Sequence, residues 1–72
     1  MKYIVSKDNE VVIFSENLVH AMVARRLFPE DHIRSAGFVN AELKPHGMSI
    51  SLEIGGHPDD EELIAHHFGK LL

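Results

Sequence analysis

The sequence predicts a small α+β domain whose elements follow the order ββαββα. Two observations carry this prediction. Runs of β-branched and aromatic residues occur in pairs, and each pair precedes a segment whose apolar residues recur every three or four positions. We expect an antiparallel sheet of about four strands with both helices packed on one face, because that arrangement buries every apolar stripe in two layers. One domain spanning residues 1–72 is expected, since no linker or low-complexity run interrupts the pattern.

The first two strands are expected within the first 15 residues. Tyr3–Val5 and Val11–Phe14 are rich in β-branched and aromatic side chains, and the polar segment Lys7–Glu10 between them favours a turn. Both runs are nearly continuous in apolar residues, so parts of both of their faces are expected to be covered.

A helix is expected next, from about Asn17 to Phe28. Ser15 or Asn17 can cap it by accepting a backbone N–H bond, and Pro29 stops it. Its apolar residues fall on one stripe at helical spacing, which we interpret as the face that packs on the sheet. The stripe consists of Leu18, Val19, Met22, Val23, Leu27 and Phe28.

Two further strands are expected at about 34–43 and 47–54, joined by a turn at 44–47. Gly37 inside the first of them indicates either a bulge or a close approach of the backbone. The second alternates clearly between apolar and polar residues, as a strand with one buried face does. Its apolar positions are Met48, Ile50, Leu52 and Ile54.

The last helix is expected at about 58–71. Its apolar residues also recur at helical spacing and predict a stripe that packs against the sheet. They are Leu63, Ile64, Phe68, Leu71 and Leu72.

Composition narrows the classes of function. The formal charge is −4, from 7 Lys and Arg against 11 Asp and Glu, and the basic residues are scattered, so no nucleic-acid partner is expected. No apolar stretch approaches the roughly 20 residues of a membrane helix, and the chain has no cysteine for a disulfide. A cytoplasmic protein is the simplest interpretation. The 6 histidines are dispersed, which favours a solvated surface over a metal store or a pH sensor.

One segment carries residues of the metal-binding type. Gly56-His57-Pro58-Asp59-Asp60-Glu61-Glu62-Leu63 follows a predicted strand and opens a predicted helix. It resembles the zinc-binding signature of the GlcNAc-deacetylase-like enzymes of the PIG-L and LmbE type. That resemblance implies that His57 and Asp60 are zinc ligands and that Asp59 is the general base of a hydrolase.

The resemblance covers about eight of 72 residues, and we interpret it as coincidental. Catalytic zinc needs three protein ligands, and the only later histidines, His66 and His67, lie on the same helix. Seven residues of helix rise about 10 Å, too far for ligand bonds near 2 Å to meet on one ion. His20, His32 or His46 could complete a site only through tertiary folding.

A structural role explains the same residues. Pro58 suits the first helical position, and Asp59, Asp60 and Glu61 place negative charge at the positive end of the helix. We therefore expect no catalytic residue, no cofactor and no metal site. A metal-dependent hydrolase-like site at His57, Asp59 and Asp60 is kept as the alternative.

A second resemblance spans nearly the whole chain. Small uncharacterised proteins encoded by bacteriophages and prophages share its order of short motifs, although they tend to have glycine in place of Glu53 and arginine in place of His57. The matching residues are Met1-Lys2-Tyr3-Ile4-Val5, Phe14-Ser15, His20, Ser35-Ala36-Gly37-Phe38, Ser49-Ile50-Ser51-Leu52-Glu53-Ile54 and His57-Pro58-Asp59-Asp60. This group implies no activity.

The expected function is therefore that of a non-enzymatic interaction module, phage- or prophage-related, that acts by binding a protein. A homodimer is one form of this expectation, because a small core and unpaired sheet edges favour association. A nucleic-acid mimic that uses the acidic surface is a third hypothesis. The sequence does not identify the partner.

Overall fold

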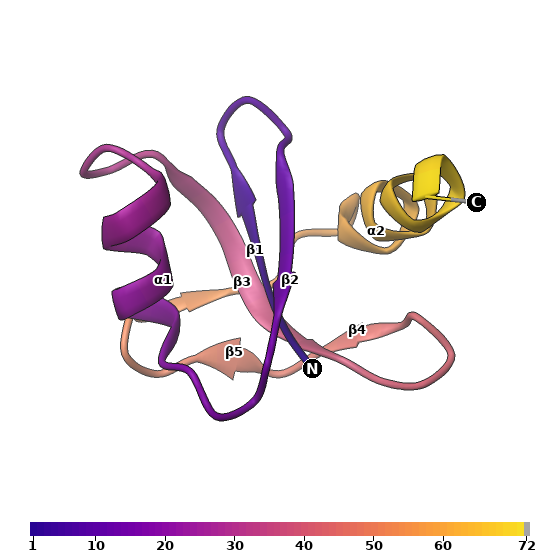
Figure 1. The fold of residues 1–72 in the computed structure, drawn as a ribbon, viewed down its shortest axis with the longest axis horizontal. Helices are drawn as coiled ribbons and strands as arrows, with labels where there is room; N and C mark the ends of the chain where they lie inside the picture. Colours follow the sequence, from indigo (N-terminus) through magenta and orange to yellow (C-terminus); the bar gives the residue numbers. More distant parts are fainter. Residues whose placement is uncertain (72) are drawn as a thin grey trace.

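Over its described residues the chain forms two helices and two small antiparallel sheets (Figure 1). The structure is a computed structural model that describes residues 1–71, with side chains up to residue 69. A four-stranded sheet has the order β2-β1-β3-β4, and β5 and β6 pair separately. The α+β class and the antiparallel four-stranded sheet are thus confirmed. The elements are β1 Lys2–Ser6, β2 Val11–Phe14, α1 His20–Leu27, β3 Ile33–Val39, β4 Pro45–His46, β5 Met48–Ser49, β6 Ile54–Gly55 and α2 Asp60–Leu71.

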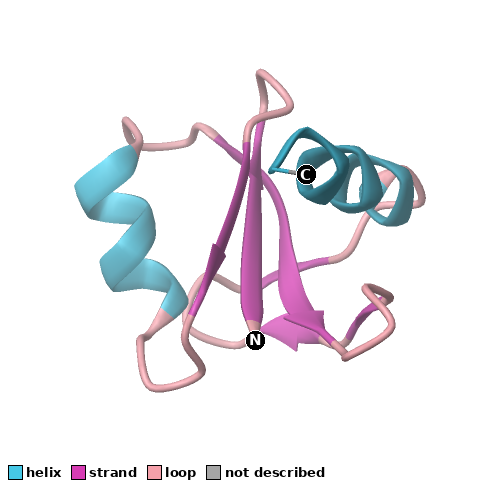
Figure 2. Ribbon diagram, turned by 45° about the vertical axis from the view of Figure 1, so that its right-hand side comes forward, coloured by secondary structure: helices cyan, strands magenta, loops and turns pink. Residues whose placement is uncertain are grey.

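The placement of both helices on one face was wrong. The strands stand between α1 and α2 (Figure 2), so each helix covers a different face. Tyr3 and Val5 of β1 pack with Ile64 of α2, while Ile4 between them packs with Ala24 of α1. Alternate residues of a strand point to opposite faces, so the continuous apolar run of β1 contributes side chains to two separate cores.

The first hairpin forms as predicted. Its turn is closed by hydrogen bonds from Asn9 N–H to Ser6 O and from Ser6 N–H to Glu10 O, both 2.9 Å. Asn9 has a φ of 64°, in the left-handed region that asparagine tolerates better than most residues. The turn fixes the register in which Ile4 lies opposite Val12.

Helix α1 begins at His20, three residues later than expected, and neither predicted residue caps it. Ser15 instead accepts a bond from Asn17 N–H in a turn that precedes the helix. The hydroxyl of Ser51, from the turn between β5 and β6, accepts the N–H of Ala21 at 3.2 Å. A distant segment thus supplies an N-terminal bond that local residues were expected to make.

We expect Ser51→Ala to lower the free energy of unfolding by about 1 kcal/mol, the usual cost of losing a helix cap. Ser15→Ala is the matched control and should change stability much less, because its bond lies outside the helix. Urea denaturation of both variants measures this. A larger loss of stability for Ser15→Ala than for Ser51→Ala would favour the local cap predicted from the sequence.

The strands expected at 34–43 and 47–54 differ from the prediction. The first ends at Val39, and the fourth strand of the sheet is β4, which lies in the segment predicted as a turn. The segment 47–54 instead contributes β5 and β6, which pair in a separate sheet. Asn40 Oδ1 accepts the N–H groups of Glu42 and Lys44, which turns the chain after β3. The second run is interrupted at 50–53, where Glu53 has a φ of 57° and donates its N–H to Ile50 O at 3.2 Å. A turn therefore replaces the middle of the most regular alternation in the sequence.

Gly37 marks a close approach of the backbone, one of the two alternatives that the sequence left open. A Cβ at this position would lie 2.9 Å from the backbone oxygen of His46 in β4 and 3.1 Å from Cε1 of Tyr3. The register irregularity of the sheet lies instead between Val5 and Ser6 of β1. Gly37 thus lets β3 and β4 meet at the ring of Tyr3.

Helix α2 starts at Asp60, close to the predicted position, and packs through the expected residues Leu63, Ile64 and Phe68. The side chain of Leu71 and the whole of Leu72, which were expected to extend this stripe, lie outside the described residues. Over the described range, no helix combines the length and apolar character needed to cross a membrane.

Candidate functional site

The residues of the zinc-like motif lie at the start of α2 and bond to its first turn. His57 Nδ1 accepts the N–H of Asp59 at 3.2 Å, and Asp60 Oδ2 accepts the N–H of His57 at 2.9 Å. This reciprocal pattern is that of a capping box, with His57 as the cap and Asp60 three residues later. Pro58 lies between them, at the first position of the turn, where a missing N–H costs nothing.

Asp60 also ties this turn to the sheet. Its carboxylate is fully buried and accepts hydrogen bonds from the Tyr3 hydroxyl at 2.5 Å and the Ser35 hydroxyl at 2.7 Å. The Arg34 guanidinium donates a third side-chain bond, at 3.2 Å. These donors come from β1 and β3, so one carboxylate joins the two central strands to the C-terminal helix. We call Tyr3, Arg34, Ser35 and Asp60 the Asp60 cluster.

Electrostatics fix the protonation of this cluster. Burial alone would raise the pKa of Asp60, but the hydrogen bonds from Tyr3, His57 N–H, Ser35 and Arg34 together lower it below 3.8. Burial, and then the bond to Asp60, raise the pKa of Tyr3 well above its ordinary value. At neutral pH Asp60 is therefore an anion and Tyr3 a neutral donor, which matches the observed bonds.

The chemistry available to the motif follows from these contacts. Both carboxylate oxygens of Asp60 already accept protein donors, and Nδ1 of His57 accepts the N–H of Asp59. Within the described residues, no group of three or more His, Cys, Asp or Glu side chains converges on a point where a metal could sit. The metal-dependent alternative would require His57 and Asp60 to give up these bonds. The arrangement acts instead as a structural anchor.

A second polar side chain in the core is His20, which was expected on a solvated surface or, through tertiary folding, at a metal site. It is 3% exposed, and its Nε2 bonds to the backbone oxygen of Gly37 at 2.8 Å. The rings of Phe14 and Phe38 pack edge-on against it, with centroids 5.3 and 5.6 Å away. Burial lowers the pKa of His20 below 6.5, so the neutral ring with a proton on Nε2 fits this site.

We expect stability to fall as the pH drops below 6.5, because His20 takes up a proton more readily in the unfolded chain. The stabilising effect of the buried neutral ring is complete above that value and is lost progressively below it. His20→Gln keeps a donor but cannot titrate, so it should lose less stability between about pH 7.5 and pH 5. Thermal melts at both pH values measure this, and equal losses in the two proteins would contradict the assignment.

Exposed apolar residues lie at the outer side of α1 and in the turn between β5 and β6. Val19 is 45% exposed, Met22 52% and Ile50 85%, although all three were expected in the core. Val19 and Met22 line a shallow hollow together with Arg25, Arg26 and Ser51, and Ile50 directly precedes Ser51. We call Val19, Met22, Arg25, Arg26, Ile50 and Ser51 the α1–turn surface.

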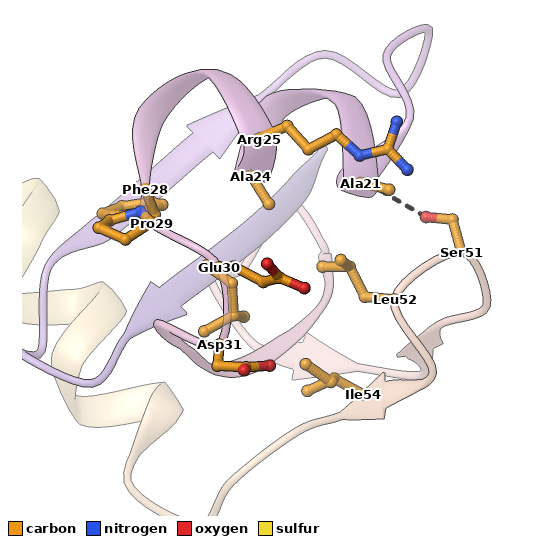
Figure 3. Close-up of a pocket in the computed structure, with 11 residues that line it drawn as sticks. Ala21, Ala24, Arg25, Phe28, Pro29, Glu30, Asp31, Ser51, Leu52 and Ile54 are labelled. Atoms are coloured by element: carbon orange, nitrogen blue, oxygen red, sulfur yellow. Dashed lines mark hydrogen bonds between the residues drawn. The ribbon is translucent and has the colours of Figure 1, made fainter.

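A groove of about 580 Å³ adjoins this surface between α1 and the turn that follows β5. Figure 3 shows Ala24, Leu52 and Ile54 along it, with Arg25 extending toward Ser51, the carboxylate of Glu30 in the middle of the view and that of Asp31 below it. Arg25 and Ser51 line both hollows, so the groove continues the α1–turn surface. Apolar side chains and charged groups of both signs therefore line the groove together.

Sequence reasoning missed the α1–turn surface because helical spacing does not distinguish a helix with one apolar face from one with two. The Asp60 cluster was also missed, since its donors lie far from Asp60 in the chain.

Comparison of the chain with protein-family models, with curated proteins and with solved structures found no match.

Proposed function

We propose that this chain is a non-enzymatic protein-interaction module, phage- or prophage-related, that binds a protein partner at the α1–turn surface. The exposure of Ile50, at 85%, is the observation that carries this proposal. Contiguous apolar surface on a soluble domain is typically where another protein binds. Binding of a partner would remove the exposed fractions of Ile50, Met22 and Val19 from water.

Charge supports the same surface. Arg25 and Arg26 lie beside the apolar residues, and among the described residues neither forms an ion pair. The net charge of the whole chain is −4, so the positive charge of Arg25 and Arg26 is a local feature of this surface. The partner segment that fits is apolar, with acidic residues beside Arg25 and Arg26 and away from Glu30 and Asp31 of the adjoining groove.

Site-specific photo-crosslinking tests this proposal. A photoreactive residue at Ile50 should crosslink a partner from a lysate of the organism that encodes the protein. Met22→Asp should abolish this product, because it adds a charge to the apolar surface and repels an acidic partner. A photoreactive residue at the exposed Glu62 of α2 serves as the matched control and should not give it. Products that form equally at both positions, or that survive Met22→Asp, would contradict the assignment of this surface.

A further inference from the structure

Strand β2 leaves an apolar edge of the sheet open. It is the end strand of the four-stranded sheet, and in the part of the chain that the structure describes only β1 pairs with it. All residues of Val11–Phe14 are apolar and half-buried. The opposite edge, β4, has two residues and begins with Pro45, which has no N–H to donate. Short strands, prolines and charges protect sheet edges; β2 is twice as long as β4 and contains neither a proline nor a charge.

The first hairpin determines which backbone groups of β2 face outward. Ser6 N–H donates to Glu10 O, so these two residues form a hydrogen-bonded pair. Such pairs alternate along an antiparallel ladder, and Ile4 with Val12 is therefore the next one. The N–H and C=O groups of Val11 and Ile13 consequently point away from β1, at the open edge.

We propose that two copies of this chain associate through β2, with the strands antiparallel and Val12 on the two-fold axis. Val11 of one copy then lies opposite Ile13 of the other, and each such pair exchanges two N–H···O=C bonds. The two four-stranded sheets become one continuous sheet. An isologous contact of this kind needs a self-complementary strand, and β2 meets that condition because it contains no charge.

The side chains and the flanking charges suit this contact. Ile13 and Val11 lie on the α2 face and would extend that core across the axis. Of the acidic residues that flank the hairpin strands, Asp8 and Glu16 already pair with His32 and with the N-terminal ammonium, at 2.9 and 3.0 Å, whereas Glu10, directly before β2, forms no ion pair among the described residues. The charges of Asp8 and Glu16 therefore oppose association less than the net charge suggests. On the other face, α1 packs over Ile4 of β1 and Ala36 of β3, so it leaves the middle of β2 open.

The dimer does not depend on the proposed partner surface, but it would place two copies of that surface in one assembly. A two-fold axis perpendicular to the sheet keeps equivalent faces on the same side. Two α1–turn surfaces would therefore face one way and could engage a two-fold symmetric or repeated partner with higher avidity. The interface is small, so we expect a weak dimer that is populated at high concentration.

Cysteine crosslinking tests the register directly, since the chain has no cysteine of its own. Across the axis, Val12 and its symmetry mate form a non-hydrogen-bonded pair with Cα atoms about 4.5 Å apart, within the range that a disulfide spans. Val12→Cys should therefore give a covalent dimer under mild oxidation. Met22→Cys, on the α1–turn surface, should give much less, and the reverse result would overturn the proposal.

Charge exchange at the same position provides the second test. Val12→Lys and Val12→Asp should each weaken dimerisation at least about tenfold, because like charges then lie opposite one another. An equimolar mixture of the two should recover the dimer in sedimentation velocity, and circular dichroism should show that each variant is folded. Met22→Lys should leave dimerisation unchanged. A wild-type protein that stays monomeric at about 1 mM, or a mixture that shows no recovery, would overturn the proposal. Neither outcome bears on crosslinking from Ile50.

Discussion

Asp60→Ala is expected to lower the free energy of unfolding by about 3–5 kcal/mol, the loss that follows removal of one partner from a buried ion pair. Without the carboxylate, the hydroxyls of Tyr3 and Ser35 and the guanidinium of Arg34 lose their common acceptor. The N–H of His57 loses its acceptor as well. Because a domain of this size is stabilised by only about 5–10 kcal/mol, much of the population should unfold under mild conditions.

Asp59→Ala is the matched control for this prediction. Asp59 has the same charge, lies one residue earlier and is exposed. Its replacement should cost less than about 1 kcal/mol, mainly through the loss of negative charge at the helix start. Urea denaturation measures both variants. Equal losses would mean that Asp60 acts only as a helix-terminal charge and does not anchor α2 to the sheet.

Gly37→Ala is the second substitution for which we expect a large effect. The new Cβ would meet two backbone oxygens, that of His46 at 2.9 Å and that of Gly47 at 3.2 Å, neither of which can rotate away as a side chain can. It would also press on the ring of Tyr3, whose hydroxyl holds Asp60. Overpacking of this kind costs about 1–3 kcal/mol. We expect a loss in the upper part of that range.

Gly69→Ala gives the contrasting result. A Cβ at Gly69 meets no atom within 4 Å, and the residue lies inside α2. Alanine favours a helix over glycine by about 0.5–1 kcal/mol, so this variant should be more stable than the wild type. Thermal melts of both variants measure the two effects. A Gly37→Ala protein as stable as the wild type would mean that β3 and β4 approach less closely than described.

The local elements could be predicted from the sequence wherever neighbouring residues determine them. The hairpin around Asn9 and the start of α2 near Pro58 follow from turn chemistry and helix capping, and both formed close to their expected positions. The prediction that His57 and its neighbours start a helix also fits the observed bonds. These features depend on residues within a few positions of one another.

Features that depend on distant contacts could not be predicted. The helix stripe of α1 was assigned wholly to the core, but Val19 and Met22 point outward because Ala24 and His20 occupy the buried face. The alternation at 48–54 predicted one strand. The chain turns there instead, and the hydroxyl of Ser51 accepts the N–H of Ala21 in α1. Periodicity records which residues are apolar, whereas packing against distant strands decides which of them are buried.

The most direct test of this account is a carbon-detected NMR titration of the Asp60 carboxyl group, with and without one equivalent of zinc. If His57 and Asp60 start α2 and join it to the sheet, the carboxyl should titrate below 3.8, as its hydrogen bonds require. Zinc should leave both the Asp60 carboxyl and the His57 ring signals unchanged at neutral pH. Zinc-dependent shifts of both groups, together with a higher melting temperature, would contradict the account and favour the metal-dependent alternative.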